Sequence, residues 1–142
     1  MGGKRLGVDY GDVRTGLAVS DPSGLIATGI GTIRPGGMRN TAREVAAAAQ
    51  EHACTGIVVG LPRNMDGSEG FRSETVRAFV ALLREETSLP IELFDERLST
   101  VEAHRIMDLT GTHGKKRRNT VDTLSAQIIL QDYLDTARRA NP

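Results

Sequence analysis

Hydrophobic positions in the N-terminal part of the chain fall into three short runs separated by turn signals. Leu6–Tyr10 ends in an Asp-Tyr-Gly-Asp break, Thr15–Ser20 ends in Asp-Pro-Ser-Gly, and Leu25–Ile33 ends in Arg-Pro-Gly-Gly. Short apolar runs bounded by Asp, Pro and Gly are typical of strands joined by tight turns. This part of the sequence therefore predicts a three-stranded antiparallel meander.

The periodicity then changes to alternating helices and strands. Helical spacing of apolar residues predicts helices over Thr41–Cys54 and Ser73–Glu86. Short apolar runs predict strands over Ile57–Leu61 and Ile91–Phe94. The first of these runs is continuous rather than alternating, which is typical of a strand that is buried on both faces of a sheet.

Two further helices are predicted in the C-terminal part. Ser99 or Thr100 is a candidate cap for the first of them. The polar, basic stretch Asp108–Asn119 is predicted to be a mobile loop, and the last helix is predicted to start near Thr120. We expect that helix to bury four large apolar residues: Leu124, Ile128, Leu130 and Leu134.

This order of elements predicts an α/β fold in which helices cover a mixed five-stranded sheet. With 142 residues, the chain is close to the roughly 150 of one ordinary domain, so we expect residues 1–142 to form a single domain. Hydrophobic residues make up 39% of the chain and charged residues 25%, which excludes a disordered protein.

Charge and cysteine content narrow the class of protein. Lys plus Arg and Asp plus Glu both total 18, which excludes a polybasic protein but leaves room for a local basic patch. No apolar stretch approaches the roughly 20 residues of a membrane span, and Asp9 interrupts the N-terminus too early for a signal peptide. Cys54 is the single cysteine, which excludes an internal disulfide and favours a core residue over a nucleophile. We expect a cytoplasmic protein.

Acidic residues occur at three of the predicted element ends. Asp9 ends the first strand, Asp95 and Glu96 end the fifth, and Asp122 lies in the first turn of the last helix. Ligands of open α/β sheets bind outside the carboxyl ends of the strands. Carboxylates gathered there need a cation, and oxygen ligands suit Mg²⁺ or Mn²⁺. Two such ions, about 4 Å apart, would activate a water and stabilise the leaving oxygen in phosphodiester hydrolysis.

Each acidic residue also has an interpretation without a metal. Asp9 is suited to accepting backbone hydrogen bonds in the turn that follows it. Asp95 and Glu96, with Arg97, resemble a surface ion-pair run. Asp122 is favourable at a helix start because of the helix dipole. The metal hypothesis therefore depends on the convergence of these residues.

The strongest local positive charge lies just before Asp122. It consists of four successive basic residues, Lys115, Lys116, Arg117 and Arg118. The run suits a clamp on phosphates, and its alternative is a solvated charge run. Arg14 and Thr15, across the turn from Asp9, are further candidates for phosphate contact.

Segments spread over nearly the whole chain resemble the YqgF/RuvX family in the same order. They are Leu6–Gly11 with Arg14–Gly16 and Ala18–Asp21, then Gly60–Pro62 with Asp66–Ser68, then Asp95–Thr100, and finally Val121–Asp122 with Ala126 and Ile129–Gln131. That family has an RNase H-like fold and is described as Holliday-junction resolvases or pre-16S rRNA nucleases. The resemblance implies a sheet of order 3-2-1-4-5 with strand 2 antiparallel.

The resemblance also implies a carboxylate set for divalent metal, two ions of Mg²⁺ or Mn²⁺. Carried over residue by residue, the set falls on Asp9, Glu96 and Asp122. Glu96 is preferred to Asp95 because an acid on the fifth strand must reach further. Asp95, Asp66 and Glu69 are further candidates for the metal shell. The residues expected to orient Glu96 or touch substrate are Arg97, Ser99 and Thr100.

The leading functional hypothesis is a metal-dependent endonuclease that trims the 5′ side of the pre-16S rRNA. One alternative is a resolvase of four-way DNA junctions, which would favour a symmetric dimer over a monomer. Another is a non-catalytic rRNA-binding assembly factor. A phosphate-handling protein is a third, since residues 9–16 also resemble the first phosphate loop of actin-like kinases, although those proteins need two such domains.

Overall fold

A five-stranded mixed sheet forms the centre of the protein. The computed structural model describes residues 3–11, 13–34, 36–64, 66–95 and 114–140. Its elements, in chain order, are β1 Lys4–Asp9, β2 Thr15–Ser20, β3 Ala27–Ile33, α1 Met38–Glu51, β4 Cys54–Leu61, α2 Phe71–Glu86, β5 Ile91–Asp95 and α4 Gly114–Ala140. The sheet order is β3-β2-β1-β4-β5. Strand β2 is antiparallel to both neighbours, whereas β1, β4 and β5 are parallel. The predicted order and direction of the strands are confirmed.

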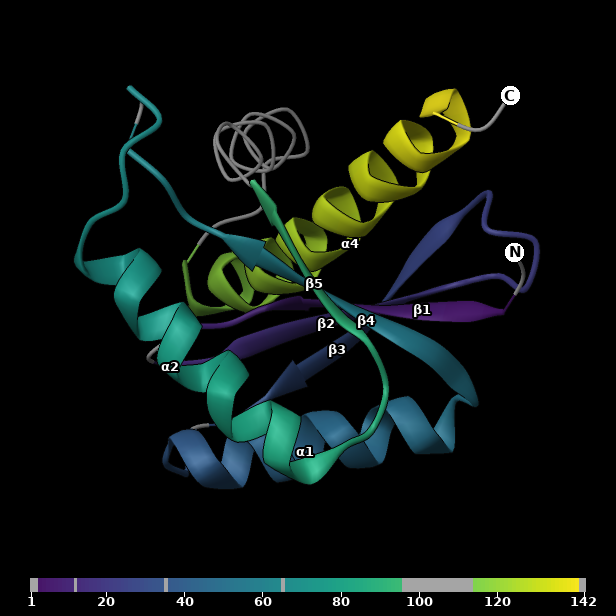
Figure 1. The fold of residues 1–142 in the computed structure, drawn as a ribbon. Helices are drawn as coiled ribbons and strands as arrows, with labels where there is room; N and C mark the ends of the chain where they lie inside the picture. The colour runs from purple at the N-terminus through teal and green to yellow at the C-terminus, as the bar shows by residue number, and fades with distance from the viewer. Residues whose placement is uncertain (1–2, 12, 35, 65, 96–113, 141–142) are drawn as a thin grey trace.

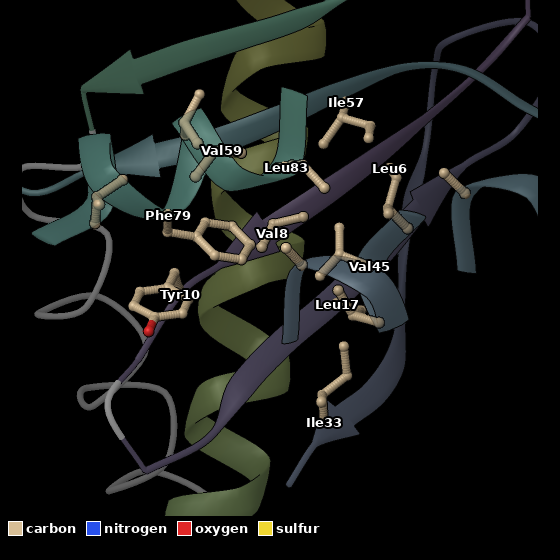
Figure 2. Packing of buried hydrophobic residues seen from close by; sticks show 14 of the residues in the cluster. Leu6, Val8, Tyr10, Leu17, Ile33, Val45, Ile57, Val59, Phe79 and Leu83 are labelled. Carbon is tan, nitrogen blue, oxygen red and sulfur yellow. The ribbon is translucent and has the colours of Figure 1, made fainter. Parts of the chain in front are cut away.

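Helices cover both faces of this sheet. Helices α1 and α2 pack together on one face, and α4 crosses the other (Figure 1). The larger hydrophobic cluster lies under α1 and α2 and includes Leu6, Val8, Val45 and Phe79 (Figure 2). The smaller cluster lies under α4 and includes Leu130. Strand β4 contributes to both clusters, which confirms the prediction that it is buried on both sides.

Helix α4 packs closely on the sheet because glycines face it. A Cβ at Gly7 in β1 would lie 2.7 Å from Leu130 Cβ, and a Cβ at Gly29 in β3 would lie 2.5 Å from Thr123 Cγ2. The side chain of Gln131 adds a polar link, since its Oε1 accepts from Ala27 N at 2.9 Å. The helix is therefore held against the first three strands of the sheet.

Helix α4 differs in two ways from the prediction. It begins at Gly114, so residues 115–118 belong to a helix and not to a loop, in keeping with the good helix propensity of Lys and Arg. Leu130 and Leu134 are buried as predicted, but Leu124 and Ile128 are only half-buried. The buried face is made instead by residues that include Ser125, Ala126 and Ile129, because the glycine-bearing strands admit small side chains at close range.

The other boundaries differ by a few residues. Strand β3 begins at Ala27, and Leu25 and Ile26 before it are 48% and 60% exposed. Their amides donate to the Asp21 carboxylate at 2.8 and 2.9 Å, which holds residues 21–26 as a loop. The helix predicted after Ser99 or Thr100 lies outside the described residues. Among the described helices, no apolar segment is long enough to cross a membrane.

Candidate active site at the carboxyl edge of the sheet

The carboxyl ends of the three parallel strands form one edge of the sheet. In the register of the sheet, Val8 pairs with Val59, and Leu61 pairs with Asp95. Asp9, which ends β1, is therefore level with the last residues of β4 and β5. The predicted placement of Asp9 and Asp95 at strand ends is confirmed. Because β4 lies between them, their backbones are two strand spacings apart, about 10 Å.

Asp9 lies on the α4 side of the sheet. Its neighbours along the chain alternate, with Val8 and Tyr10 in the cluster under α1 and α2 and Gly7 against Leu130 of α4. Tyr10 fixes this arrangement, because its ring stacks on Phe79 at a centroid distance of 4.3 Å (Figure 2). This anchoring role of Tyr10 is not among the roles predicted from the sequence.

Asp95 belongs to the opposite face. Phe94 packs edge-on against Tyr133 of α4 at 6.0 Å, whereas Leu93 packs on the cluster under α1 and α2. Since side chains alternate along a strand, Asp95 shares the side of Leu93 and not the side of Asp9. The two aspartates therefore do not converge on one face of the sheet.

The N-terminal half of α4 extends toward the carboxyl edge. Ala126 and Leu130 lie over Gly7 in β1, and Leu134 approaches Gly24, in the loop at the opposite end of the sheet. Helix α4 thus runs antiparallel to β1. Position 122 lies one turn before Ala126, in the part of α4 that is nearer the carboxyl edge.

Several predicted site residues lie outside the described part. Glu96, Arg97, Ser99 and Thr100 are outside the described residues, and so are the side chains of residues 114–122, which include Asp122 and the basic run. In the part of the chain that the structure describes, no group of three His, Cys, Asp or Glu side chains is arranged to hold a metal ion.

The two further acidic candidates are already engaged with protein donors. Glu69 accepts two hydrogen bonds from Arg77, both at 2.8 Å, and lies 3.8 Å from Arg63. The hydrogen bond from Arg77 is the main reason why the pKa of Glu69 is lowered. Asp66 accepts from the backbone and the hydroxyl of Ser68 at 2.9 and 2.6 Å. These contacts organise the loop after β4 and make both residues weaker candidates for the metal shell.

Arg14 and Thr15 lie where the sequence predicts them, next to Asp9. Asp9 pairs with Gly16 in the β1–β2 ladder, which sets Thr15 at the same edge. Cys54 is buried at the start of β4, and burial raises the pKa of its thiol. The prediction of Cys54 as a core residue is confirmed.

Comparison with known proteins identifies similar sequences along almost the whole chain. A family model described as "RuvX: Holliday junction resolvase" matches residues 3–136. A protein of Geobacillus kaustophilus named "Putative pre-16S rRNA nuclease" is 44% identical over 137 residues, covering 95% of this chain and 99% of that protein. A protein of the same name from Myxococcus xanthus is 43% identical over 135 residues, covering 95% and 89%.

A similar fold occurs in a solved structure with little sequence identity. The T. thermophilus RuvC in complex with a Holliday junction substrate aligns with a TM-score of 0.59 at 14% identity, covering 97% of this chain and 96% of that one. This similarity supports the RNase H-like fold predicted from the sequence.

Proposed function

The chain belongs to the RuvX family, and from this we propose that it is a metal-dependent endonuclease that hydrolyses phosphodiester bonds in structured nucleic acid. We propose the 5′ side of the pre-16S rRNA as its substrate. The relatives that carry the name pre-16S rRNA nuclease support this choice, since they match over nearly their whole length.

The observation that carries the proposal is the position of Asp9. It ends a parallel strand at the carboxyl edge of an open α/β sheet, where such sheets bind their ligands. The same residue faces the side of the sheet that α4 covers, and the N-terminal half of α4, which includes position 122, extends toward that edge. This arrangement supports the proposal that Asp122 joins Asp9 in one site.

A divalent cation fits this donor set by its chemistry. We propose that Asp9, Glu96 and Asp122 hold two ions of Mg²⁺ or Mn²⁺, which prefer carboxylate oxygens. When bound, such ions lower the pKa of a water and stabilise the leaving oxygen. The chain's own part is to present the carboxylates from three separate elements, so that the cations offset their mutual repulsion.

The choice of Glu96 over Asp95 is supported by the alternation in β5. Phe94 lies on the α4 side and Asp95 on the other. Asp95 is thereby turned away from the face on which Asp9 lies. Glutamate is also the longer side chain, which helps to span the two strand spacings between β1 and β5.

A four-way DNA junction is the second candidate substrate. The description of the matching family model favours it. A resolvase would act as a homodimer that matches the symmetry of the junction, whereas trimming of rRNA is compatible with a monomer. For the rRNA substrate we place the protein in the cytoplasm, with the basic run Lys115–Arg118, Arg97, Ser99 and Thr100 contributing to substrate contact.

The test compares two labelled substrates, a 5′-extended pre-16S rRNA and a four-way DNA junction, each with Mg²⁺ or Mn²⁺. Wild-type protein and Asp9→Asn are measured side by side, and Asp21→Asn serves as the matched control at the other end of the sheet. We expect wild-type and Asp21→Asn proteins to cut the RNA and Asp9→Asn to lose at least about 100-fold in rate.

Other outcomes redirect the assignment. Symmetric cutting of the junction alone, lost in Asp9→Asn, would move the substrate to DNA. Tight RNA binding without cleavage, unchanged in Asp9→Asn, would favour the non-catalytic assembly factor. Full cleavage by Asp9→Asn would overturn the proposed site.

A further inference from the structure

A hollow of about 170 Å³ lies at the same edge of the sheet but on the face opposite Asp9. It is formed by the β1–β2 turn, the start of β2, the end of β3 and the start of α1. Thr15, which lines it, shares the face of Leu17 in the cluster under α1, whereas Asp9 faces α4. The hollow is therefore adjacent to the proposed active site and separated from it by the rim of the sheet.

A buried hydroxyl that has no hydrogen-bond partner among the described residues lines this hollow. Thr15 is only 2% exposed, and its side chain makes no hydrogen bond to any residue that the structure describes. Buried hydroxyls are almost always hydrogen-bonded, because leaving one unpaired costs free energy. An unpaired hydroxyl at the wall of a hollow therefore points to a ligand that supplies the partner.

The start of α1 supplies further donors to the same hollow. Its N-cap is Gly37, and neither a capping side chain nor an acidic first-turn residue serves it. The first helical bond runs from Thr41 N to Gly37 O at 3.0 Å, so the amides of residues 38–40 have no helical acceptor. A Cβ at Gly37 would meet no atom within 4 Å, which leaves room for a ligand to approach these amides. Such a helix end favours an anion.

The charge of the walls agrees with an anion. Arg14 and Arg34 both line the hollow, and none of its described lining residues is acidic. Arg39, also in the first turn of α1, is directed elsewhere, because it pairs with Glu85 and Glu86 at 3.1 and 3.3 Å. The Thr15 hydroxyl, the amides and the Arg34 guanidinium together form a donor set for the oxygens of a phosphate group, and Arg14 adds positive charge to the wall.

We propose that this hollow binds one phosphodiester group of the nucleic-acid strand, at a linkage beside the one that is cut. The inference rests on the proposed function and adds a second point of attachment to it. A strand that crosses the rim of the sheet would present one phosphate to Asp9 and a neighbouring one to Thr15 and the start of α1. Contacts of this kind set the register of the strand without reading its sequence.

The test uses the full chain, labelled with ¹⁵N, without divalent metal so that nothing is cut. It is titrated first with inorganic phosphate and then with a 5′-extended rRNA fragment. We expect both to shift the amide signals of Met38, Arg39 and Asn40. Thr15→Val and Arg34→Ala should each weaken RNA binding about tenfold, since a hydrogen bond or ion pair to a charged group is lost. Arg43→Ala, on the same helix but outside the hollow, should leave binding unchanged.

A second measurement locates the linkage. RNA fragments that carry a single neutral methylphosphonate are scanned along the strand, with wild type and Arg34→Ala compared. We expect one position, next to the cleaved bond, where the modification weakens wild-type binding but has little further effect on Arg34→Ala. Because Arg34 is exposed, its replacement by alanine tests the proposal even if Thr15→Val fails to fold.

The outcomes separate this proposal from the proposed function. If the protein cleaves RNA but shows no amide shifts at the start of α1, and both variants bind with unchanged affinity, the phosphate site in the hollow would be wrong. The proposed nuclease function would be unaffected. Shifts with inorganic phosphate but not with nucleic acid would overturn the proposal in favour of a free-phosphate site. Shifts with RNA in a protein that cuts no substrate would support the phosphate site and count against the nuclease.

Discussion

Gly7 of β1 and Leu130 of α4 lie so close that a Cβ added to residue 7 would be 2.7 Å from Leu130 Cβ. The carbonyl oxygen of Ala126, one turn earlier, would be 3.2 Å away. This contact sets the distance between the strand that ends in Asp9 and the helix that carries Asp122.

Replacing Gly7 by alanine is expected to destabilise the protein. The new methyl group meets the backbone and the Cβ of α4, which cannot move aside as a side-chain tip can, so we expect a loss of about 1–3 kcal/mol in the free energy of unfolding. Urea denaturation measures it. Gly29→Ala is the control, because its nearest atom is Thr123 Cγ2, and it should cost less. Equal stability of Gly7→Ala and wild type would show that α4 adjusts freely.

Asp95 and Glu96 are expected to differ in their effect on cleavage. Because Asp95 lies on the opposite face from Asp9, Asp95→Asn should retain most activity, whereas Glu96→Gln should lower the cleavage rate at least about 100-fold. Single-turnover cleavage with saturating Mg²⁺ compares the two. If Asp95→Asn lowered the cleavage rate more than Glu96→Gln, Asp95 and not Glu96 would be the metal-binding residue.

The basic run should contribute to binding through phosphate contacts. Replacing Lys115, Lys116, Arg117 and Arg118 by alanine removes up to four contacts, each of which contributes about one unit to the slope of log affinity against log salt. We expect weaker RNA binding and a flatter slope, measured by fluorescence anisotropy between low and high salt. An unchanged slope would identify the run as a solvated charge cluster. Circular dichroism checks that α4 is still helical.

Ser73 should stabilise the start of α2. Its side chain is fully buried and its hydroxyl donates to the carbonyl of Pro62, just after β4. Ser73→Ala leaves that carbonyl without its donor, so we expect a loss of about 1–3 kcal/mol in unfolding free energy. Thr75→Ala, whose exposed hydroxyl bonds within the helix, is the control and should cost little.

Asp21 should make stability depend on pH in the acid range. Its pKa is lowered from 3.8 to about 2, first by the hydrogen bond from Ile26 N and then by that from the Ser23 hydroxyl. A carboxyl whose pKa is lower in the folded state stabilises the fold above its unfolded pKa and loses this contribution as pH falls through the folded value. The stability difference between wild type and Asp21→Asn should therefore shrink between about pH 4 and pH 2. A difference that stays constant over this interval would contradict the shift.

Local sequence signals predicted most of the fold. Apolar runs and turn residues suffice for the strands, and Asp9 and Asp95 are visibly the last residues of two of them. The buried face of α4 was predicted less well, because side-chain size favoured Leu124 and Ile128 over Ala126. That face depends on Gly7 and Gly29, which lie about a hundred residues earlier, and a helical pattern carries no information about such a partner.

The candidate site could be predicted only in part for the same reason. The packing of α4 on β1 extends the half of the helix that includes position 122 toward the edge at which Asp9 lies, and the convergence of the two acidic residues stays a prediction. The face of Asp95 becomes clear only from the contacts of Leu93 and Phe94. The sequence Arg34-Pro35-Gly36-Gly37 predicts the end of a strand and carries no signal for the hollow beside Gly37. Thr15, which also lines the hollow, lies on another strand.

Gln131 links the last helix to the first strands, through Ala27 N and through Leu25 O at 2.9 Å. Since α4 follows all five strands in the chain and covers β1, β2 and β3, these strands lack this cover until residues 114–140 have been synthesised. Until then Ala18, Ala27 and Val58, which end up buried under α4, face solvent in the nascent chain. Completion of this sheet therefore awaits the synthesis of α4, and a chain stopped before Gln131 would expose an apolar surface that favours aggregation.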